Sequence, residues 1–507
     1  MPRMELKHML NLAVALLVPA AILHAAGTAK PNFILIMADD MGFSDIGCYG
    51  SEIQTPNIDR LAREGMRFTQ FYNNAKCTTT RASLLSGMYP RASGNSIPRE
   101  IPTIGETMRA LGYQTGMSGK WHLGNRAPQR PFDRGFDEYY GLMGGATNFF
   151  NPAQLKPGGK FQAFGHNDQL ITTFPPGYYT TDAFAEHAIT TITRFVKEGK
   201  PFFLHLAFNA PHYPLHAFPE DIAKYRGKYR KGWGTLREER YARLLKMGIV
   251  NPKWKQPPAD SKSYDWATAN QDWEDLRMAT YAAMVDRMDQ NIGRLLASLK
   301  DLGIDDNTVV MFLSDNGGCT EEPDGRDDTQ QPSHVSTHTA VGPAWGAAQN
   351  TPFRRYKSWM NEGGVSTPFI VRWPAGIKAG AMTNQIGHVI DVLPTCVELS
   401  GAKVDAKVEG RSLAAVLRGG QRTAPEKLFW EWGGNCAMRQ GKWKLVWDTL
   451  NIEKAWQLYD IEADRTEMND LAKQQPDRVQ QMKADYLTWA NQLGRKVPGL
   501  PSSKSAR

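Results

Sequence analysis

Short apolar, β-branched runs alternate along the chain with segments of helical spacing, and this alternation restricts the fold more than any other feature. The runs that we predict as buried strands are 32–37 (NFILIM), 202–207 (FFLHLA), 308–313 (TVVMFL) and 368–373 (PFIVRW). Helical spacing covers 56–64, 182–196 and 273–302. Apolar strands separated by helices are typical of βαβ units. The pattern therefore predicts an α/β fold with a large mixed, mostly parallel sheet flanked by helices.

The pattern changes near Gly419-Gly420. Short aromatic strands are expected at 428–432, 436–439 and 443–447, with glycines between them, and a helix at about 475–493. These elements predict a smaller C-terminal antiparallel sheet with a closing helix. We therefore divide the chain into a catalytic domain, 30–424, and a C-terminal subdomain, 425–507.

The first 29 residues are predicted to be a secretory signal peptide. Arg3 and Lys7 precede an apolar run at 9–23, which is too short to cross a bilayer, and the small residues 27–29 follow it. A retained lipid-facing anchor is the less favoured alternative. With 41% hydrophobic and 22% charged residues, the rest of the chain fits a globular protein without a membrane span. We expect an exported protein.

The cysteine content and the net charge indicate in which compartment the protein works and which kinds of partner it binds. Five cysteines in 507 residues are too few and too scattered for a disulfide framework. The chain has no Asn-x-Ser/Thr sequon, which favours a bacterial periplasm or exterior. Its net charge of +8 includes no Lys/Arg block, so anionic small molecules or glycans are expected as partners and nucleic acid is not.

Polar residues follow three of the predicted strands, where ligands bind in open α/β sheets. They are the pair Asp39-Asp40, the pair Asp315-Asn316, and Asn209 with His212. Each pair alone could be a helix cap or a turn. Two acidic pairs at two strand ends instead favour a metal ion. Hard oxygen ligands without thiolates point to Ca²⁺ or Mg²⁺ and less to Zn²⁺.

A second group of candidate residues consists of Cys77 and the basic residues of two later segments. Cys77 precedes a helix-like segment at 82–86, so its thiol could lie at a helix N-terminus and act as a low-pKa nucleophile. A small buried cysteine beside a threonine-rich cap is the alternative, and this segment alone favours it. The segments 119–124 and 354–357 add basic residues, which taken singly are usually surface charges.

Together these residues closely resemble the formylglycine-dependent, arylsulfatase-like sulfatases of the alkaline-phosphatase superfamily. The likeness runs through nearly the whole chain after the predicted signal peptide and follows the family's order. Its motifs are 31–40 (PNFILIMADD), 55–65 (TPNIDRLAREG), 77–87 (CTTTRASLLSG), 119–124 (GKWHLG), 210–214 (APHYP), 314–318 (SDNGG), 350–357 (NTPFRRYK), 362–364 (EGG) and 458–460 (LYD).

The resemblance implies a sulfate-ester hydrolase whose Cys77 is oxidised by a formylglycine-generating or sulfatase-maturing enzyme. The hydrated aldehyde then serves as the nucleophile. A serine would be left as a stable sulfate ester, whereas a geminal diol keeps a second hydroxyl whose deprotonation expels sulfate. The implied ligands of one Ca²⁺, with Mg²⁺ less favoured, are Asp39, Asp40, Asp315, Asn316 and an oxygen of the modified Cys77.

The resemblance also implies roles for the charged residues. Arg81, Lys120 and Lys357 would hold the sulfate oxygens. His212 and Lys357 would protonate the leaving oxygen, His122 would take the last proton of the diol, and Asp315 would activate the attacking hydroxyl.

Two positions depart from the usual family pattern. Thr79 stands where Pro or Ala is usual two residues after the cysteine, and we expect conversion of Cys77 nonetheless. The segment 354–357 (RRYK) replaces the glycines that many relatives have before the catalytic lysine, and we still assign that role to Lys357.

Two other functions stay open at this stage. One is a phosphodiester or phosphonate monoester hydrolase of the same superfamily, and the other is a non-catalytic binder of sulfated glycans. Either an aryl or a carbohydrate sulfate would suit an exported enzyme. An aromatic and basic segment, 224–266, together with Phe149, Phe150, Trp345 and Trp359, could line the leaving-group side, or could simply pack that segment against the core.

Overall fold

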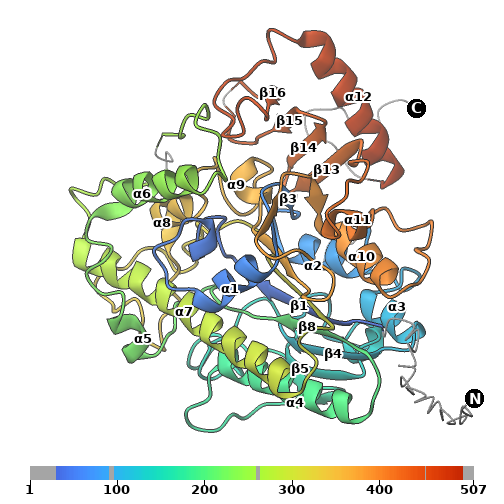
Figure 1. Cartoon of the computed structure of the whole chain (residues 1–507). Coiled ribbons are helices and arrows are strands. Elements are labelled where there is room, and N and C mark those ends of the chain that lie inside the picture. The colour runs from blue at the N-terminus through green and yellow to red at the C-terminus, as the bar shows by residue number, and fades with distance from the viewer. Residues whose placement is uncertain (1–29, 91–95, 259–262, 452, 495–507) are drawn as a thin grey trace, which may run out of the picture.

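The computed structural model describes residues 30–90, 96–258, 263–451 and 453–494, so the predicted signal peptide at 1–29 lies outside the described residues. A ten-stranded sheet runs through the larger part of the molecule (Figure 1). Its strands, in spatial order, are β11 (Ala381–Thr383), β2 (Met66–Phe68), β10 (Phe369–Arg372), β9 (Thr308–Ser314), β1 (Asn32–Ala38), β8 (Phe202–Ala207), β4 (Gln114–Gly119), β5 (Glu138–Leu142), β6 (Phe164–His166) and β7 (Gln169–Leu170).

The centre of this sheet is parallel. Strands β9, β1, β8, β4 and β5 pair in parallel, whereas β10 and β6 pair antiparallel to their neighbours. The predicted large mixed, mostly parallel sheet is therefore confirmed. Because the five central strands run the same way, their carboxyl ends share one edge of the sheet.

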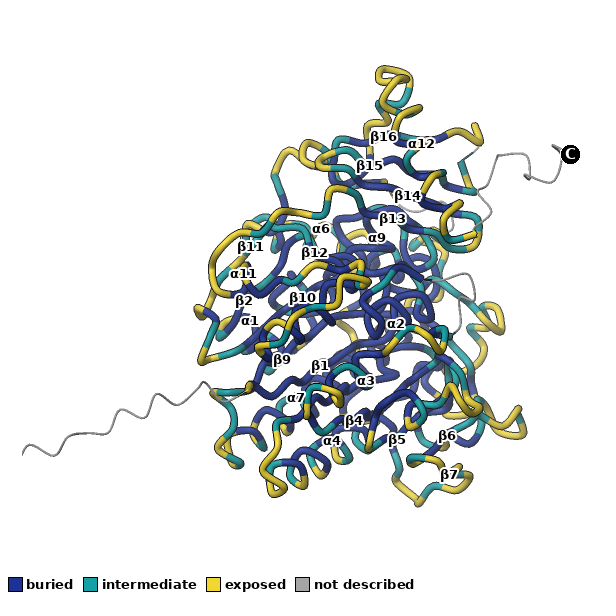
Figure 2. The backbone as a smooth tube through the Cα atoms, turned by 90° about the vertical axis from the view of Figure 1, so that its right-hand side faces the viewer, coloured by how far each residue is buried: buried dark blue, intermediate teal, exposed yellow. Residues whose placement is uncertain are grey.

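Helices cover both faces of the sheet, and alternate residues of each strand point into separate cores. In β1, Ile34 and Ile36 face one core, while Phe33 and Leu35 face the other. The first core is covered by α1 (Pro56–Glu64), α4 (Thr180–Lys197), α5 (Pro219–Ala223), α6 (Gly232–Lys246), α7 (Gln271–Asp301) and α8 (Gly342–Gln349). The second is covered by α2 (Cys77–Ser86), α3 (Ile104–Ala110), α10 (Val392–Leu399) and α11 (Ala414–Leu417). Figure 2 shows the central strands buried between these layers. No described helix is both long and apolar enough to cross a membrane.

A smaller antiparallel sheet follows, as the aromatic pattern predicts. Its strands are β13 (Lys427–Trp432), β14 (Asn435–Gln440), β15 (Trp443–Trp447) and β16 (Gln457–Asp460), and α12 (Pro476–Gln492) packs against it. Two further small elements, the pair β3 (Phe71–Tyr72) with β12 (Gly387–His388) and the short helix α9 (Glu362–Val365), lie in the larger part of the chain. The boundary at 424/425 stays a prediction.

Buried ion pairs join the smaller sheet and the segment that follows it to the short helix α9. Glu362 in α9 accepts hydrogen bonds from Lys444 Nζ at 2.8 Å and Arg465 Nε at 2.7 Å, and Lys444 Nζ also lies 2.9 Å from a Glu467 oxygen. All four side chains are at most 2% exposed. Burial raises the pKa of Glu362, but Lys444 and Arg465 outweigh it and hold that pKa well below the usual range. Removing one cation would leave an uncompensated buried carboxylate.

We therefore expect Lys444→Met to lower the free energy of unfolding by about 3–5 kcal/mol at pH 7. Burial already raises the pKa of Glu467, and removing Lys444 takes away the main cation that opposes this, whereas Glu362 keeps Arg465. The native state of the variant therefore binds more protons at Glu467 than the unfolded state does. The loss should therefore shrink as the pH falls from 7 toward 5. Guanidinium unfolding at both pH values measures this change.

Lys442→Met is the matched control. Lys442 Nζ lies 2.7 Å from Asp460, but its side chain is 45% exposed, so we expect a cost of at most about 1 kcal/mol. Equal costs for the two variants would show that the buried ion pairs do not stabilise the contact between α9 and the smaller sheet.

Candidate active site

Cys77 is the first residue of α2, as predicted, and is only 3% exposed. All ten residues of α2 are buried. Thr79, the residue that departs from the family pattern, directs its hydroxyl at the carbonyl oxygens of Asn74 and Lys76. Its hydroxyl therefore has hydrogen-bond partners in the loop that precedes the helix. Burial raises the pKa of the Cys77 thiol, although Lys120 and Lys357 oppose this. For the unmodified thiol, burial outweighs the nearby cations, which agrees with the small buried cysteine that the sequence of this segment favours over a low-pKa nucleophile.

Three carboxylates and an amide meet at the carboxyl ends of β1 and β9. The Asp40 backbone N–H donates to Asp315 Oδ1 at 3.1 Å, and Asn316 Nδ2 donates to Asp40 Oδ1 at 2.7 Å. Asp39 lies beside them, and all four side chains are at most 1% exposed. Asp40 adopts a φ of 64°, a conformation that a non-glycine residue holds only where its surroundings enforce it. The parallel pairing of β1 with β9 thus brings together the two acidic pairs of the sequence.

Three cationic side chains reach these carboxylates from separate segments. Lys120, directly after β4, places Nζ 2.6 Å from Asp39 Oδ2. Lys357 Nζ lies 2.8 Å from Asp40 Oδ2, and Arg81 Nη2 in α2 lies 2.9 Å from Asp315 Oδ2. Each predicted cation thus pairs with a different predicted carboxylate.

Several buried polar atoms in this group lack hydrogen-bond partners among the described residues. Asp39 Oδ1 and Asn316 Oδ1 accept none, although Arg81 Nη2 lies 3.4 Å from the former. Buried oxygens without partners are costly. Carboxylate and amide oxygens are the donors that hard divalent cations prefer, so these residues fit such an ion.

The electrostatics of Asp315 and Asp40 differ. Burial, together with the nearby Asp39, raises the pKa of Asp315 to about 7. Burial also raises the pKa of Asp40, but His212, Lys357 and Lys120 outweigh it and hold that pKa well below the usual range. A cation among these carboxylates would relieve the repulsion from Asp39 that helps to raise the pKa of Asp315.

Two histidines flank the carboxylates. His212 Nε2 lies 3.4 Å from Asp40 Oδ2, and its Nδ1 lies 2.6 Å from the Tyr213 carbonyl oxygen. Because that carbonyl can only accept, Nδ1 carries the proton and the neutral ring presents a lone pair at Nε2. Burial and the neighbouring lysines lower the pKa of His212 to about 3, despite Asp40.

His122 has a φ of 60°, and a Cβ on Gly145 would lie only 2.7 Å from its ring, so the glycine permits this contact. Its Nδ1 is buried without a partner among the described residues. Burial and the positive charges of Lys120 and Arg81 lower the pKa of His122 well below its usual value. Both imidazoles are therefore neutral at neutral pH.

Sequence reasoning missed two residues at the edge of this site. Glu321 lies 3.6 Å from Lys357 Nζ and 3.1 Å from Lys76 Nζ, and it accepts a hydrogen bond of 2.5 Å from the Tyr213 hydroxyl. Tyr213 lies within the motif APHYP, and Glu321 follows the motif SDNGG by three residues. Their positions in or near these motifs were the only available signal.

The aromatic residues of the leaving-group hypothesis mostly belong to the core. Phe149 and Trp345 are fully buried, and the Trp345 indole N–H donates to Glu274 Oε2 at 2.9 Å. Trp345 also contacts Trp233 and Trp266 edge-on. The alternative interpretation, in which these rings pack the 224–266 segment against the core, is the one that the contacts support.

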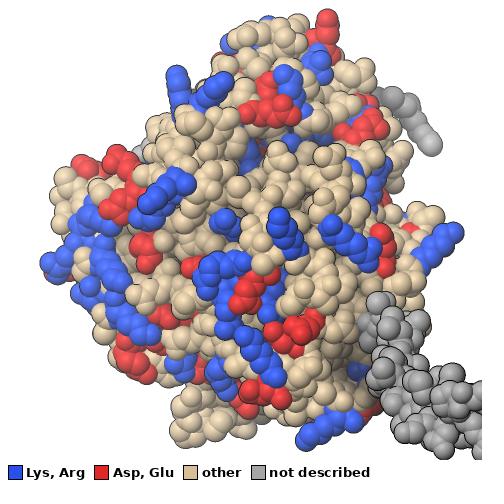
Figure 3. All heavy atoms as spheres, viewed as in Figure 1, with Lys and Arg blue, Asp and Glu red and all other residues tan. Residues whose placement is uncertain are grey.

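On the face drawn in Figure 3, Lys and Arg lie among Asp and Glu.

Comparison with known proteins finds the same similarity over residues 31–492. The sequence profile of the family described as Sulfatase matches residues 31–402, and that described as N-sulphoglucosamine sulphohydrolase, C-terminal, matches residues 354–492. An uncharacterized sulfatase of Schizosaccharomyces pombe is 33% identical, with 92% of this chain and 95% of that protein covered. The arylsulfatase of Klebsiella aerogenes is 33% identical, with 75% and 88% covered. The crystal structure of Ps i-CgsB in complex with k-i-k-neocarrahexaose is 29% identical with a TM-score of 0.69, and covers 94% and 96%.

Proposed function

Because this chain belongs to the sulfatase family, we propose that it hydrolyses carbohydrate or aryl sulfates with Cys77, converted to formylglycine, as nucleophile and with one Ca²⁺. The observation that carries this proposal is the convergence of Asp39, Asp40, Asp315, Arg81, Lys120 and Lys357 in one buried site beside Cys77. Inorganic sulfate would be one product.

A Ca²⁺ ion and a formylglycine residue would together form the reactive centre. Ca²⁺, held by Asp39, Asp40, Asp315 and Asn316, would polarise a sulfate oxygen and fix its orientation. Formylglycine at position 77 would supply, as its hydrate, a nucleophilic hydroxyl and a second hydroxyl for product release. The raised pKa of the unmodified thiol supports the need for this conversion.

The cationic side chains bind the sulfate group. The three carboxylates are balanced by Arg81, Lys120 and Lys357, so a divalent cation gives the site a net positive charge. Arg81 is fixed by donating from Nη1 to the Lys120 carbonyl at 2.6 Å, and its buried Nε has no partner among the described residues. That N–H and the two ammonium groups are the donors available to sulfate oxygens.

We assign the proton transfers to Lys357, His212 and His122. The Lys357 ammonium, paired with Asp40, holds a proton for the leaving oxygen. The neutral His212 tautomer has a lone pair at Nε2, so His212 must first gain a proton before it can act as the predicted acid. Neutral His122, with Nδ1 unpartnered, can accept a proton during product release.

Mass spectrometry and substrate assays test this function directly. Protein co-expressed with a formylglycine-generating enzyme should show a loss of about 18 Da in the peptide that carries Cys77, distinct from cysteine oxidation, which adds mass. It should release sulfate from 4-nitrophenyl sulfate or a sulfated oligosaccharide. Faster cleavage of bis-4-nitrophenyl phosphate would instead assign a phosphodiesterase, and glycan binding with unmodified Cys77 would assign a binder.

We also predict that calcium removal abolishes turnover. Chelation with EGTA should stop sulfate release and lower the Tm, because a ligand that binds only the native state stabilises it by about 2.7 kcal/mol at 100 times its Kd. Adding Ca²⁺ should restore both, and Mg²⁺ should restore less, because it prefers to retain its water ligands. Activity that is unchanged after chelation, in protein shown by elemental analysis to be metal-free, would contradict the metal assignment.

The substrate class and the location belong to the same proposal. The relative bound to k-i-k-neocarrahexaose supports a carbohydrate sulfate as substrate. The residue pattern at 1–29 supports export to a bacterial periplasm or exterior. N-terminal sequencing of protein recovered from the periplasm, with a start near residue 30, would test the export.

A further inference from the structure

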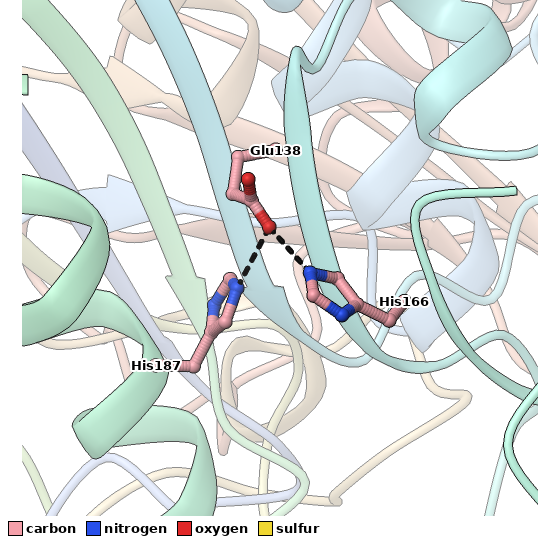
Figure 4. A group of neighbouring side chains, drawn as sticks. All are labelled: Glu138, His166 and His187. Atoms are coloured by element: carbon pink, nitrogen blue, oxygen red, sulfur yellow. Dashed lines mark hydrogen bonds and ion pairs between the residues drawn. The ribbon is translucent and has the colours of Figure 1, made fainter. Parts of the chain in front are cut away.

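A histidine and carboxylate cluster lies on the outer strands of the large sheet, outside the candidate active site. Glu138 in β5 places Oε1 2.7 Å from His166 Nε2 in β6 and 3.2 Å from His187 Nε2 in α4. Figure 4 shows both imidazole rings facing the same carboxylate oxygen. Among the described residues, this is one of two groups of three such side chains whose ligand atoms lie within 4.8 Å of one another; the other is Asp39, Asp40 and His212.

The fold fixes all three side chains from separate elements. Tyr140 pairs with His166 across β5 and β6, so Glu138, two residues earlier, projects from the same face of the sheet as His166. Helix α4 covers that face and contributes His187, whose ring stacks on Tyr140 with centroids 5.1 Å apart. The turn after His166 is held by Asn167, whose side chain accepts a hydrogen bond of 2.7 Å from the Tyr139 N–H.

Arg194 contacts one oxygen of the Glu138 carboxylate and leaves the other oxygen available to a metal ion. Its Nη2 lies 2.6 Å from Glu138 Oε2, whereas both imidazoles face Oε1. The charge of Arg194 is shared with Glu198, 3.8 Å away. A second partner that holds the outer oxygen of a carboxylate is a usual feature of protein metal sites.

We propose that Glu138, His166 and His187 bind one Zn²⁺ ion through Oε1 and the two Nε2 atoms, with water as the fourth ligand. Two imidazoles and one carboxylate suit Zn²⁺, which takes four ligands at ~2.0–2.2 Å. Ca²⁺ needs six to eight oxygens and does not suit this set.

The present separations are compatible with such an ion. Tetrahedral ligands at those distances lie about 3.4 Å apart, close to the 3.2 Å between His187 Nε2 and Glu138 Oε1. The His166 side chain is 50% exposed, so it can move outward from 2.7 Å and leaves solvent access for the water ligand.

This site is separate from the candidate active site. Glu138 pairs with Gly116 in the parallel register of β4 and β5, four residues before Lys120. At about 3.3 Å per residue, the cluster is displaced by roughly 13 Å along the strands toward their amino ends. The proposed sulfatase mechanism uses none of its three residues. A bound ion would join α4 to the β5 and β6 strands and stabilise the outer part of the sheet.

Zn²⁺ titration of the tag-free, Ca²⁺-loaded protein tests the proposal. Isothermal titration calorimetry should show one Zn²⁺ per chain, and Co²⁺ in place of Zn²⁺ should give the visible absorption of a four-coordinate ion. His166→Gln and His187→Gln should each weaken Zn²⁺ binding at least tenfold and remove the rise in Tm that Zn²⁺ causes. His166→Gln is the safer variant because that side chain is half exposed.

Two control variants separate this site from others. His334→Gln removes an exposed histidine that contacts Ser336, and His212→Gln removes the histidine of the other described group. Both should keep the Zn²⁺ affinity of the wild-type protein. Wild-type protein that binds no Zn²⁺ in the micromolar range, or binding as tight in folded His166→Gln and His187→Gln as in wild type, would overturn the proposal. So would loss of binding in His212→Gln alone.

Discussion

Replacing Cys77 with alanine is expected to reduce kcat on the order of 10⁶-fold, as removal of the nucleophile does in other covalent hydrolases. Alanine cannot be converted to formylglycine, so no hydroxyl nucleophile forms at the start of α2. The fold should persist because alanine is small, favours helices and fills most of a site that is only 3% exposed. Sulfate release and the Tm, both measured on protein loaded with Ca²⁺, check the two halves of this prediction.

Cys396→Ala is the matched control. Cys396 is also a fully buried helical cysteine, but it lies in α10 within the second core. The same change there should cost about 1 kcal/mol of stability or more and leave kcat unchanged. Appreciable turnover by Cys77→Ala would show that Cys77 is not the nucleophile, whatever its modification state.

The carboxylates and the amide of the candidate site could be predicted from the sequence because they directly follow two predicted strands. Asp39-Asp40 and Asp315-Asn316 follow apolar runs, and parallel pairing must bring such strand ends to one edge of the sheet. Their contacts, such as Asn316 Nδ2 to Asp40 Oδ1, follow from this pairing. The apolar pattern also predicted the central strands because these are buried on both faces.

The cationic half was placed only by the family resemblance. Lys120 and His122 follow β4, whose sequence QTGMSG contains no apolar run and was not predicted as a strand. The reason is packing: a Cβ on Gly116 would lie 2.9 Å from Leu204 and 3.1 Å from Thr191, so this strand needs small residues where α4 packs closely. A strand with small residues has no periodic signal.

Contacts between distant residues that do not follow a predicted strand could not be predicted from the sequence. The two ion pairs of Glu362 join residues 82 and 103 positions apart, and Glu138, His166 and His187 come from two strands and a helix. A single charged residue in a sequence is normally a surface residue, so burial of Lys444 has no local signal. Only the three-dimensional arrangement shows which of these charges are compensated and which could hold an ion.

The second large effect is expected for Asp315→Asn, which should reduce kcat on the order of 10³-fold and weaken Ca²⁺ binding. Both Asp315 oxygens face donors: Oδ1 accepts from the Asp40 N–H and Oδ2 from Arg81 Nη2. An asparagine amide has only one acceptor, so in either orientation its NH₂ group opposes a donor. The variant also removes a negative charge from the predicted ion site and the predicted base beside the nucleophile. Steady-state kinetics at saturating Ca²⁺, with calorimetric Ca²⁺ titration, measures both losses.

Asp289→Asn separates this effect from the general cost of altering a buried aspartate. Asp289 is 1% exposed and accepts hydrogen bonds from the N–H groups of Asn57 and Ile58 at the start of α1, and it is not among the proposed site residues. Its variant should lose stability yet keep Ca²⁺ affinity and kcat. If Asp315→Asn lost only stability as well, then Asp315 would merely anchor Arg81 and the Asp40 backbone. If it retained both normal Ca²⁺ affinity and normal kcat, then the proposed metal site would be wrong, because a variant that lacks one of its carboxylate ligands should bind the ion more weakly.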